Sequence, residues 1–585
     1  MRKNNQEQLE KLRHSLAHIM MQALENLYKA VPAIGPAIED GFYHDFDSEQ
    51  KITEADLKKI KKEMFKIISK DFPIEKITMS IDEGIKLLKE KNYVYTLELA
   101  EELKEKREKE ITFYKQGDFI NMCKGPHLKS TGEVNMEAFK LTKIAGAYWR
   151  NDENNKMLSR IYGVAFETPE ELENYKLMLV EAEKRDHRKL GKELDLFTFS
   201  DLIGPGLPLF TPKGTLIRDL IIDKIQKIQK VYGYQRVDIP HITKSDLYKK
   251  SGHWEKFGDE LFKVKGKSET EFVIKPMSCP HHTQIYASKP VSYKDLPIRY
   301  VETTKVYRDE QAGELIGLAR VRSITQDDGH VFCSPDQIEE EVGNIVNVIK
   351  EFYQSLDMFK EGDFWVSLSV RDSKDLGKYL GDEKLWDKAE STLEKIAKKE
   401  KLPYKRVEGE AAFYGPKLDF MFKDALGRER QLATAQLDFI MPERFELEYT
   451  DKDGLKKTPV MIHRAIAGSL ERFIAVMIEH FAGAFPLWLS PVQIRVLPIT
   501  DAHKEYAKEI FEILKEKDFR VELDDDNENL GKKIRKSKVE KIPYFLVIGD
   551  EEIKTKTITV ESRDQGNLGQ MSIEDFLKKL EKEGK

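Results

Sequence analysis

The sequence contains very little cysteine and no long apolar run. Cys123, Cys279 and Cys333 are the only cysteines among 585 residues, too few for a disulfide framework, so we expect a reducing compartment. No window approaches the ~18 apolar residues of a membrane-spanning helix, and the first residues lack the apolar stretch of a secretory signal. The sequence therefore predicts a cytoplasmic protein without a membrane partner.

An excess of charge of one sign is also missing. The 97 Lys and Arg residues nearly balance the 103 Asp and Glu residues, which leaves a net charge of −6. Such a total can conceal a local basic face, so nucleic-acid binding is neither indicated nor excluded. Hydrophobic residues make up 40% of the chain, which excludes a disordered or fibrous protein. The 585 residues allow about three to five domains.

The glycine-rich motifs of doubly wound nucleotide-binding folds are absent. Neither GxxxxGK[ST] nor GxGxxG occurs, and the strand patterns between Pro205 and Leu489 do not alternate regularly with helical patterns. An antiparallel sheet flanked by helices is therefore favoured for this region. After Pro491 strand and helix patterns alternate up to Ile548, which predicts a small α/β domain with parallel connections.

The N-terminal region has a different pattern. Apolar residues spaced three or four apart predict one amphipathic helix over residues 6–30. Charged helices and strands follow, which indicates a compact α+β domain, and a lysine- and glutamate-rich helix from Pro169 to about Glu193 predicts a solvated connector. We therefore expect four segments: residues 1–168, a linker at 169–196, a domain at 197–489 and a domain at 490–585.

The first segment contains two pairs of residues of the kinds that commonly bind metal ions. His14 and His18 are four residues apart on the predicted helix, and Cys123 and His127 are also four apart. Because thiolate and imidazole are the usual zinc ligands, the two pairs could form one zinc site. Alternatively, they never meet, or they hold a water and an ester in a metal-free hydrolytic pocket. The HExxH motif of metalloproteases is excluded, because no glutamate follows His14.

The central region contains a strand, loop and strand from Arg299 to His330. Arg308 can donate two hydrogen bonds to a phosphate, and Glu310 can accept from an exocyclic amine. A buried structural ion pair explains such an arginine better when it is considered alone. A strand that ends at Pro240 precedes this segment, and the helix start Gly468-Ser-Leu-Glu-Arg472 follows it.

These three segments, in this order, resemble the signature motifs of class II aminoacyl-tRNA synthetases. Flanking residues resemble the threonyl-tRNA synthetase family over nearly the whole chain, in the segments Lys275–His282, Thr325–His330, Phe413–Lys417 and Ile462–Arg464. The resemblance implies an α+β multidomain protein with a class II antiparallel-sheet catalytic domain, an N-terminal editing domain and a C-terminal anticodon-binding domain. It also implies ATP-dependent ligation of L-threonine to tRNA(Thr) in a homodimer.

The resemblance implies one catalytic Zn²⁺ per chain, bound by Cys279, His330 and His463. A zinc ion with open coordination positions can bind the threonine hydroxyl, which valine lacks. Serine keeps the hydroxyl and loses only a methyl, so zinc rejects it weakly and a second, hydrolytic site is needed for seryl-tRNA(Thr). The resemblance assigns this editing role to His14, His18, Cys123 and His127.

The resemblance further implies the substrate-binding residues. The residues matched to the ATP site, with Mg²⁺ accompanying the nucleotide, are Arg308, Glu310, Arg320, Gln431 and Arg472. The residues matched to the threonine site are Gln326, Asp328, Tyr414 and Lys417. The catalytic set is Arg308, Arg472, Lys417 and His253, of which the last helps to deprotonate the terminal tRNA ribose. The anticodon-binding residues are Asn527, Glu552 and Arg563, and the basic run from Lys532 to Lys538 is expected on the tRNA backbone.

The chain departs from the family pattern at several positions. Asn121 and Thr96 replace an aspartate and a lysine of the editing domain, so both the rate and the presence of editing are open. Ile324 replaces a phenylalanine expected to stack on adenine, and Glu561 replaces an anticodon-contacting arginine. Many members carry a small ubiquitin-like domain before the editing helix, and we expect this chain to be a shortened form without it. Alternative functions are a class II synthetase of another specificity or a non-catalytic RNA-binding paralogue.

Overall fold

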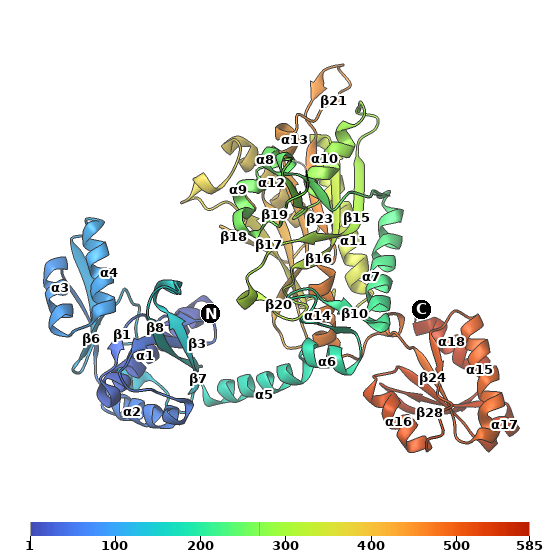
Figure 1. The fold of residues 1–585 in the computed structure, drawn as a ribbon, viewed down its shortest axis with the longest axis horizontal. Coiled ribbons are helices and arrows are strands. Elements are labelled where there is room, and N and C mark those ends of the chain that lie inside the picture. Colours follow the sequence, from blue (N-terminus) through green and yellow to red (C-terminus); the bar gives the residue numbers. More distant parts are fainter. Residues whose placement is uncertain (1, 268, 584–585) are drawn as a thin grey trace. The chain divides into compact units, whose positions relative to one another are not determined.

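The computed structural model describes residues 2–267 and 269–583 (Figure 1). The chain forms two compact units, Met1–Val180 and Glu181–Lys585. Within the described ranges, no helix is both long and apolar enough to cross a membrane.

The N-terminal unit is built around the predicted amphipathic helix, α1 (Arg2–Tyr28). Its apolar face, including Leu16 and Met20, packs on Phe42, Phe46 and Ile161 of an antiparallel sheet. The strand order is β1-β3-β8-β7, with β2 paired to β3. The bounds are β1 (Val31–Pro32), β2 (Ala37–Ile38), β3 (Gly41–Asp47), β7 (Phe139–Tyr148) and β8 (Met157–Ala165). Helix α2 (Leu57–Ser69) packs beside α1.

The N-terminal unit contains a second sheet, and the loop after this sheet returns to α1. This sheet has three antiparallel strands in the order β4-β5-β6. Two helices pack on it and form a separate small hydrophobic core. The bounds are β4 (Ile74–Ser80), α3 (Ile81–Glu90), α4 (Val94–Glu105), β5 (Glu110–Gln116) and β6 (Phe119–Met122). Since β6 ends at Met122, Cys123 opens the loop that follows the sheet.

The connector is two helices rather than the single predicted one. Helix α5 (Pro169–Arg185) ends before Asp186, and α6 (His187–Glu193) begins after it. Asp186 has non-helical backbone angles, and its side chain caps α6 by accepting a hydrogen bond from the Arg188 amide. The prediction of a solvated connector is wrong for α6, because His187, Leu190 and Gly191 are buried.

The second unit contains an eight-stranded sheet in the order β11-β15-β16-β23-β20-β19-β17-β18. All neighbours are antiparallel except β11–β15 and β17–β18, so the predicted antiparallel core is confirmed. The bounds are β11 (Gln235–Arg236), β15 (Ile298–Tyr307), β16 (Ser323–Cys333), β17 (Phe364–Val370), β18 (Tyr404–Glu408), β19 (Lys417–Lys423), β20 (Glu429–Asp438) and β23 (Val460–Ala465).

Helices cover this sheet and enclose the largest core of the molecule. They are α7 (Pro212–Val231), α11 (Ile338–Gln354), α12 (Glu383–Lys399) and α14 (Leu470–Phe481). Helix α14 begins at Leu470, close to the helix start indicated by Gly468–Arg472, and residues 460–465 before it form β23. Strand β16 begins at Ser323, since residues 316–320 before it form a turn.

Smaller elements beside the sheet position two predicted site residues. Helix α9 (His253–Phe257) begins with His253, and α10 (Cys279–Ala287) begins with Cys279. They accompany α8 (Ser245–Ser251), α13 (Ile440–Arg444) and the small sheet β12-β14-β13. The strands are β12 (Ile242–Lys244), β13 (Lys263–Val264) and β14 (Phe272–Ile274).

The C-terminal part of this unit is a five-stranded sheet in the order β25-β24-β26-β27-β28. Strands β25, β24 and β26 are parallel, whereas β27 pairs antiparallel with β26 and β28 pairs antiparallel with β27. The sheet is therefore mixed rather than purely parallel. The strands are β24 (Ile494–Pro498), β25 (Val521–Leu523), β26 (Tyr544–Ile548), β27 (Ile558–Ser562) and β28 (Gly566–Met571). The helices are α15 (Lys504–Glu516), α16 (Leu530–Val539), α17 (Asp550–Thr555) and α18 (Ile573–Glu583).

Candidate active sites

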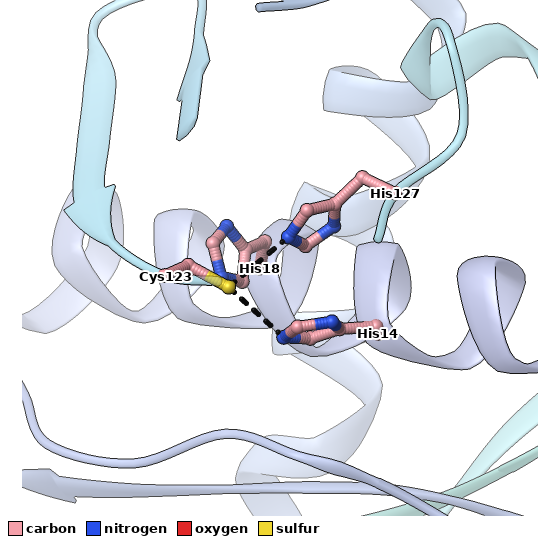
Figure 2. A group of neighbouring side chains, drawn as sticks. All are labelled: His14, His18, Cys123 and His127. Atoms are coloured by element: carbon pink, nitrogen blue, oxygen red, sulfur yellow. Dashed lines mark hydrogen bonds between the residues drawn. The ribbon is translucent and has the colours of Figure 1, made fainter. Parts of the chain in front are cut away.

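The two metal-type pairs of the N-terminal unit meet in one cluster (Figure 2). His14 and His18 project from α1 toward the loop that carries Cys123 and His127. The Cys123 Sγ lies 3.2 Å from the Nε2 of His14 and 3.3 Å from the Nε2 of His127. One ligand atom from each of the four residues lies within 4.8 Å of all the others. The alternative that the pairs never meet is therefore wrong.

Burial makes this cluster electrically neutral at pH 7. It lowers the pKa of His14, lowers that of His18 well below its usual range, and lowers that of His127 to about 3. Burial also raises the pKa of the Cys123 thiol. Three neutral imidazoles and a thiol can accept hydrogen bonds from water and donate to it without a metal.

A cavity of about 820 Å³ opens beside this cluster. Its wall includes His14, His18 and Cys123, and also the two unusual positions Thr96 and Asn121. The Thr96 hydroxyl donates to the Tyr93 carbonyl at 3.2 Å, and the Asn121 side chain accepts from the Met122 amide at 2.9 Å. Both side chains are uncharged, and each is held by a hydrogen bond with the local backbone.

A second cavity, of about 680 Å³, lies over the eight-stranded sheet. All five residues matched to the ATP site line it, together with Ile324 and Gln326. These five are Arg308, Glu310, Arg320, Gln431 and Arg472. They come from the end of β15, the turn before β16, strand β20 and the first turn of α14.

Two arginines in the wall of this cavity, Arg308 and Arg472, form no salt bridge among the described residues, whereas Arg320 and Arg430 approach carboxylates. The Nε of Arg308 is buried without a hydrogen-bond partner among the described residues, and burial lowers the pKa of Arg308. Desolvation and the charge of Arg430 lower the pKa of Arg472, which lies in the positive first turn of α14. An anion in the cavity would relieve both effects, so the wall suits a polyphosphate.

Sequence reasoning missed Arg430, which lines this cavity, and Asp419, which contacts two of the predicted site residues. The position of Arg430 beside Gln431 was the available signal. The Asp419 carboxylate holds two predicted site residues, because it accepts hydrogen bonds from Gln431 at 2.7 Å and from Lys417 at 2.7 Å. Lys417 and Asp419 lie two residues apart on β19, whereas only the pairing of β19 with β20 brings Gln431 to them, and that register has no local signal in the sequence.

Cys279, His330 and His463 form a second Cys/His cluster, and all three are buried. One ligand atom from each lies within 4.8 Å of the others. Strands β16 and β23 pair His330 directly with His463. The His463 Nε2 lies 2.9 Å from the Asp438 Oδ2, and the His330 Nδ1 lies 2.7 Å from the Nδ1 of His282. Each histidine thus has an orienting partner and a second nitrogen, which is typical of metal ligands.

Two of the four residues matched to the threonine site, Tyr414 and Asp328, contact this cluster. The Tyr414 ring lies 5.1 Å from the His463 ring, and the Asp328 carboxylate lies 3.6 Å from the His330 Nε2. Burial raises the pKa of Asp328 to about 6. Lys417 is held by Asp419, and Gln326 lines the adjoining ATP cavity.

His253 is buried beside the same cluster. Its Nε2 lies 3.8 Å from the Cys279 Sγ, and its Nδ1 lies 2.8 Å from the Ser251 hydroxyl. Burial lowers the pKa of His253 to about 3. The imidazole is therefore neutral at pH 7 and able to accept a proton only weakly.

The structure separates the three residues matched to anticodon binding. Asn527 and Glu552 follow β25 and β26, at the carboxyl edge of the parallel strands. Arg563 follows β27 at the opposite edge, where its guanidinium donates to the carbonyls of Phe485 and Lys541. Because β27 runs antiparallel to β26, Arg563 lies at the other end of the sheet from Asn527 and Glu552, and its role at the anticodon stays a prediction.

The basic run on α16 is also less exposed than expected. Lys533 is buried and donates to the backbone carbonyls of Pro498 and Asp524. Lys532 and Lys536 remain at the surface, where they approach acidic side chains. Lys533 is therefore a structural residue of the helix rather than a backbone contact for RNA.

Three domain families match the chain. The "tRNA synthetase class II core domain (G, H, P, S and T)" matches residues 262–481, and the "Anticodon binding domain" matches residues 493–583. The "Threonyl and Alanyl tRNA synthetase second additional domain" matches residues 111–162. Together with the antiparallel core and its cavities, these matches define a class II aminoacyl-tRNA synthetase with an editing and an anticodon-binding domain.

Relatives narrow the class to one family. The chain is 48% identical to the threonine–tRNA ligase of Caldanaerobacter subterraneus subsp. tengcongensis, over 97% of this chain and 86% of that one. It is 48% identical to that of Gloeobacter violaceus, over 99% and 93%. A crystal structure of the RNA binding domain of threonyl-tRNA synthetase from Cryptosporidium parvum Iowa II is similar, with 37% identity, a TM-score of 0.64, and coverage of 68% of this chain and 98% of that one. The chain belongs to the threonine–tRNA ligase family, which confirms the family and fold class predicted from the motifs.

Proposed function

We propose that the chain ligates L-threonine to tRNA(Thr). The observation that carries this proposal is the cationic cavity with Arg308 and Arg472 next to the buried cluster of Cys279, His330 and His463. In the first step a carboxylate oxygen of threonine attacks the α-phosphorus of ATP, which forms threonyl-adenylate and releases pyrophosphate. In the second step a terminal ribose hydroxyl of the tRNA attacks the carbonyl carbon, and AMP leaves.

The arginines supply most of the chemistry in the first step. Negative charge is redistributed over the phosphates as the α-phosphorus is attacked, so positioned cations stabilise the transition state without a proton transfer. Arg308 and Arg472 fit this role, with Glu310, Arg320 and Gln431 holding the nucleotide and Mg²⁺ accompanying it. Lys417, fixed by Asp419, is suited to the threonine carboxylate or the α-phosphate.

The donor set beside the cavity fits one Zn²⁺. Cys279, His330 and His463 would hold the ion, and Asp438 and His282 orient the two imidazoles. A bound zinc ion would supply coordination for the amino and hydroxyl groups of threonine, which distinguishes threonine from valine. Gln326, Asp328 and Tyr414 would complete the pocket for the amino acid.

We also propose hydrolytic editing of seryl-tRNA(Thr) in the N-terminal unit. The 820 Å³ cavity can take the aminoacylated end of a tRNA. His14, His18, Cys123 and His127 can hold the water that attacks the ester carbonyl, so that serine and free tRNA leave. Asn121 and Thr96 lack the charges usual at their positions, and we expect slow hydrolysis.

Three further assignments follow from the family. Asn527 and Glu552 contact the anticodon, and their common edge of the C-terminal sheet supports this role. The chain acts as a homodimer, and it acts in the cytoplasm.

Threonine-dependent exchange of pyrophosphate into ATP tests the ligase activity. With purified chain and ATP, threonine should support exchange, whereas proline and alanine should not. Exchange that depends on another amino acid would indicate a class II synthetase of different specificity. No exchange with any amino acid, despite binding of tRNA, would indicate a non-catalytic RNA-binding paralogue. Hydrolysis of seryl-tRNA(Thr) above the rate in buffer tests the editing proposal separately.

A further inference from the structure

His187, at the start of α6, lies outside the ATP cavity but contacts its wall. The backbone amide of Leu318 donates to the His187 Nε2 at 3.2 Å, and the His187 Nδ1 lies 2.7 Å from the Glu479 Oε1. Because an amide N–H can only donate, the Nε2 must be the acceptor nitrogen. The Nδ1 therefore carries the proton and donates to the Glu479 carboxylate, so the imidazole is neutral and its tautomer is fixed.

Glu479 holds this histidine from α14, the helix that begins with the phosphate-binding turn of Arg472. Its other carboxylate oxygen accepts from the Arg428 guanidinium. Burial would raise the pKa of Glu479, but the hydrogen bond from His187 and the charge of Arg428 outweigh it and lower the pKa. The Glu479 carboxylate therefore holds α6 against α14 through His187.

Asp186, His187 and Glu479 also have the composition of a cation site. A metal role does not fit the contacts. The His187 Nε2 already accepts from Leu318, the Nδ1 bears a proton, and Glu479 neutralises Arg428. The cluster is therefore a chain of hydrogen bonds rather than a ligand set.

The group that His187 holds is the tight turn before β16. The amides of Ala319 and Arg320 both approach the Ile316 carbonyl, at 2.8 Å and 3.3 Å. Leu318 is fully buried under this turn, while Ile316, Ala319 and Arg320 face the ATP cavity. The Arg320 guanidinium then reaches the Glu310 carboxylate at 2.7 Å. Holding the Leu318 amide therefore fixes three cavity-lining residues at once.

Gly317 allows the close approach. Its φ is +49°, and a Cβ at this position would lie 2.3 Å from the His187 Nε2. The turn can lie directly against the imidazole only because residue 317 has no side chain.

We propose that His187 is a positioning residue of the ATP site, which fixes the Ile316–Arg320 turn, and with it Arg320, through the Leu318 amide. The proposal rests on the proposed ligase function. It gives His187, in the second helix of the connector, a specific role in nucleotide binding. Loss of His187 weakens the binding of ATP and leaves the threonine pocket intact.

Three variants of the full chain test this in threonine-dependent ATP–pyrophosphate exchange. His187→Leu keeps the packing and removes both hydrogen bonds, so the KM for ATP should rise about tenfold, with much smaller changes in kcat and in the KM for threonine. His187→Gln can accept from Leu318 and donate to Glu479, and it should restore the KM for ATP to within about threefold of wild type. Gly317→Ala pushes the turn away from the imidazole and should raise the KM for ATP without any change at residue 187.

His480→Leu is the matched control, because His480 lies next to Glu479 on α14 but packs on Phe481. It should leave the KM for ATP unchanged. An unchanged KM for ATP in both His187→Leu and Gly317→Ala overturns the proposal. Equal losses for ATP and threonine, or failure of His187→Gln to rescue, overturn it as well and indicate a merely structural histidine. Absence of exchange in the wild-type chain would instead refute the proposed ligase function.

Discussion

The two Cys/His clusters of this chain use the same side chains in different surroundings. In the catalytic unit, Cys279 is fully buried, and each of its two partner histidines has an orienting group, Asp438 or His282. In the N-terminal unit, Cys123 is half-buried beside a large cavity. There His127 contacts the Ser15 hydroxyl at 3.2 Å, and the His18 Nδ1 has no partner among the described residues.

The difference indicates that surroundings, rather than the ligand types, separate a metal site from a hydrolytic one. A carboxylate on the second nitrogen of a histidine raises its basicity and fixes its orientation, which favours a bound cation. Neutral imidazoles without such a partner interact more readily with water, and a neighbouring cavity can supply an ester. We therefore expect zinc at the cluster of Cys279, His330 and His463, and water at the cluster of His14, His18, Cys123 and His127.

The largest effect should come from removing one thiol. Cys279→Ala should reduce the zinc content from about one ion per chain to nearly none and should abolish threonine-dependent exchange. Cys123→Ala is the matched change in the other cluster and should leave both the zinc content and the exchange unchanged. Elemental analysis of the two purified variants measures the difference. Zinc lost from Cys123→Ala and kept by Cys279→Ala would reverse the two assignments.

The next effect separates the two activities. Arg472→Ala removes a cation from the phosphate site, so exchange should fall about 10²- to 10³-fold. Hydrolysis of seryl-tRNA(Thr) should stay within about twofold of wild type, since the two sites belong to separate compact units and share no residue. Lys508→Ala on α15 is a suitable control for loss of a positive charge. Equal loss of both activities in Arg472→Ala would show that the two sites are not independent.

A smaller effect probes the orienting groups. Asp438→Asn should weaken zinc affinity about 10- to 100-fold, because His463 loses its carboxylate partner. Ser15→Ala, the corresponding change beside His127, should slow hydrolysis of seryl-tRNA(Thr) and leave zinc affinity unchanged. Competition with a chromogenic chelator measures the affinity in both variants. Equal zinc affinity in Asp438→Asn and wild type would contradict the role of the carboxylate.

Much of the fold could be predicted where local patterns are strong. The spacing of apolar residues predicted α1, and the strand pattern from Arg299 predicted β15 and β16. Strands β20 and β23 were missed for physical reasons. Residues 460–465 are buried on both faces, so their apolar run is indistinguishable from the start of a helix. Residues 429–438 alternate poorly because polar residues, such as Gln431 and Gln436, line the site.

The two clusters differ in how far the sequence could predict them. His14 with His18 and Cys123 with His127 carry four-residue spacings that suggested ligands, although only the fold joins the pairs. Cys279, His330 and His463 lie 51 and 133 residues apart, and their assignment came from the resemblance alone. The pairing of β16 with β23 brings the two histidines together, and such long-range register has no local signal. The contact of His187 with Glu479 likewise has no local signal in the sequence.

The smallest predicted effect is a pH dependence of stability from the N-terminal cluster. The folded pKa of His127 is about 3, below its unfolded value of about 6.5. The unfolded chain therefore binds the extra proton first as the pH falls, and stability is lost below about pH 6.5. For this one histidine the loss between pH 7 and pH 5.5 is roughly 1 kcal/mol. His127→Gln cannot titrate, so its thermal midpoint should fall less than that of the wild-type chain over the same range. Identical pH dependence in the two chains would show that His127 is not held neutral by burial, and the neutral character of the hydrolytic cluster would then lose its support.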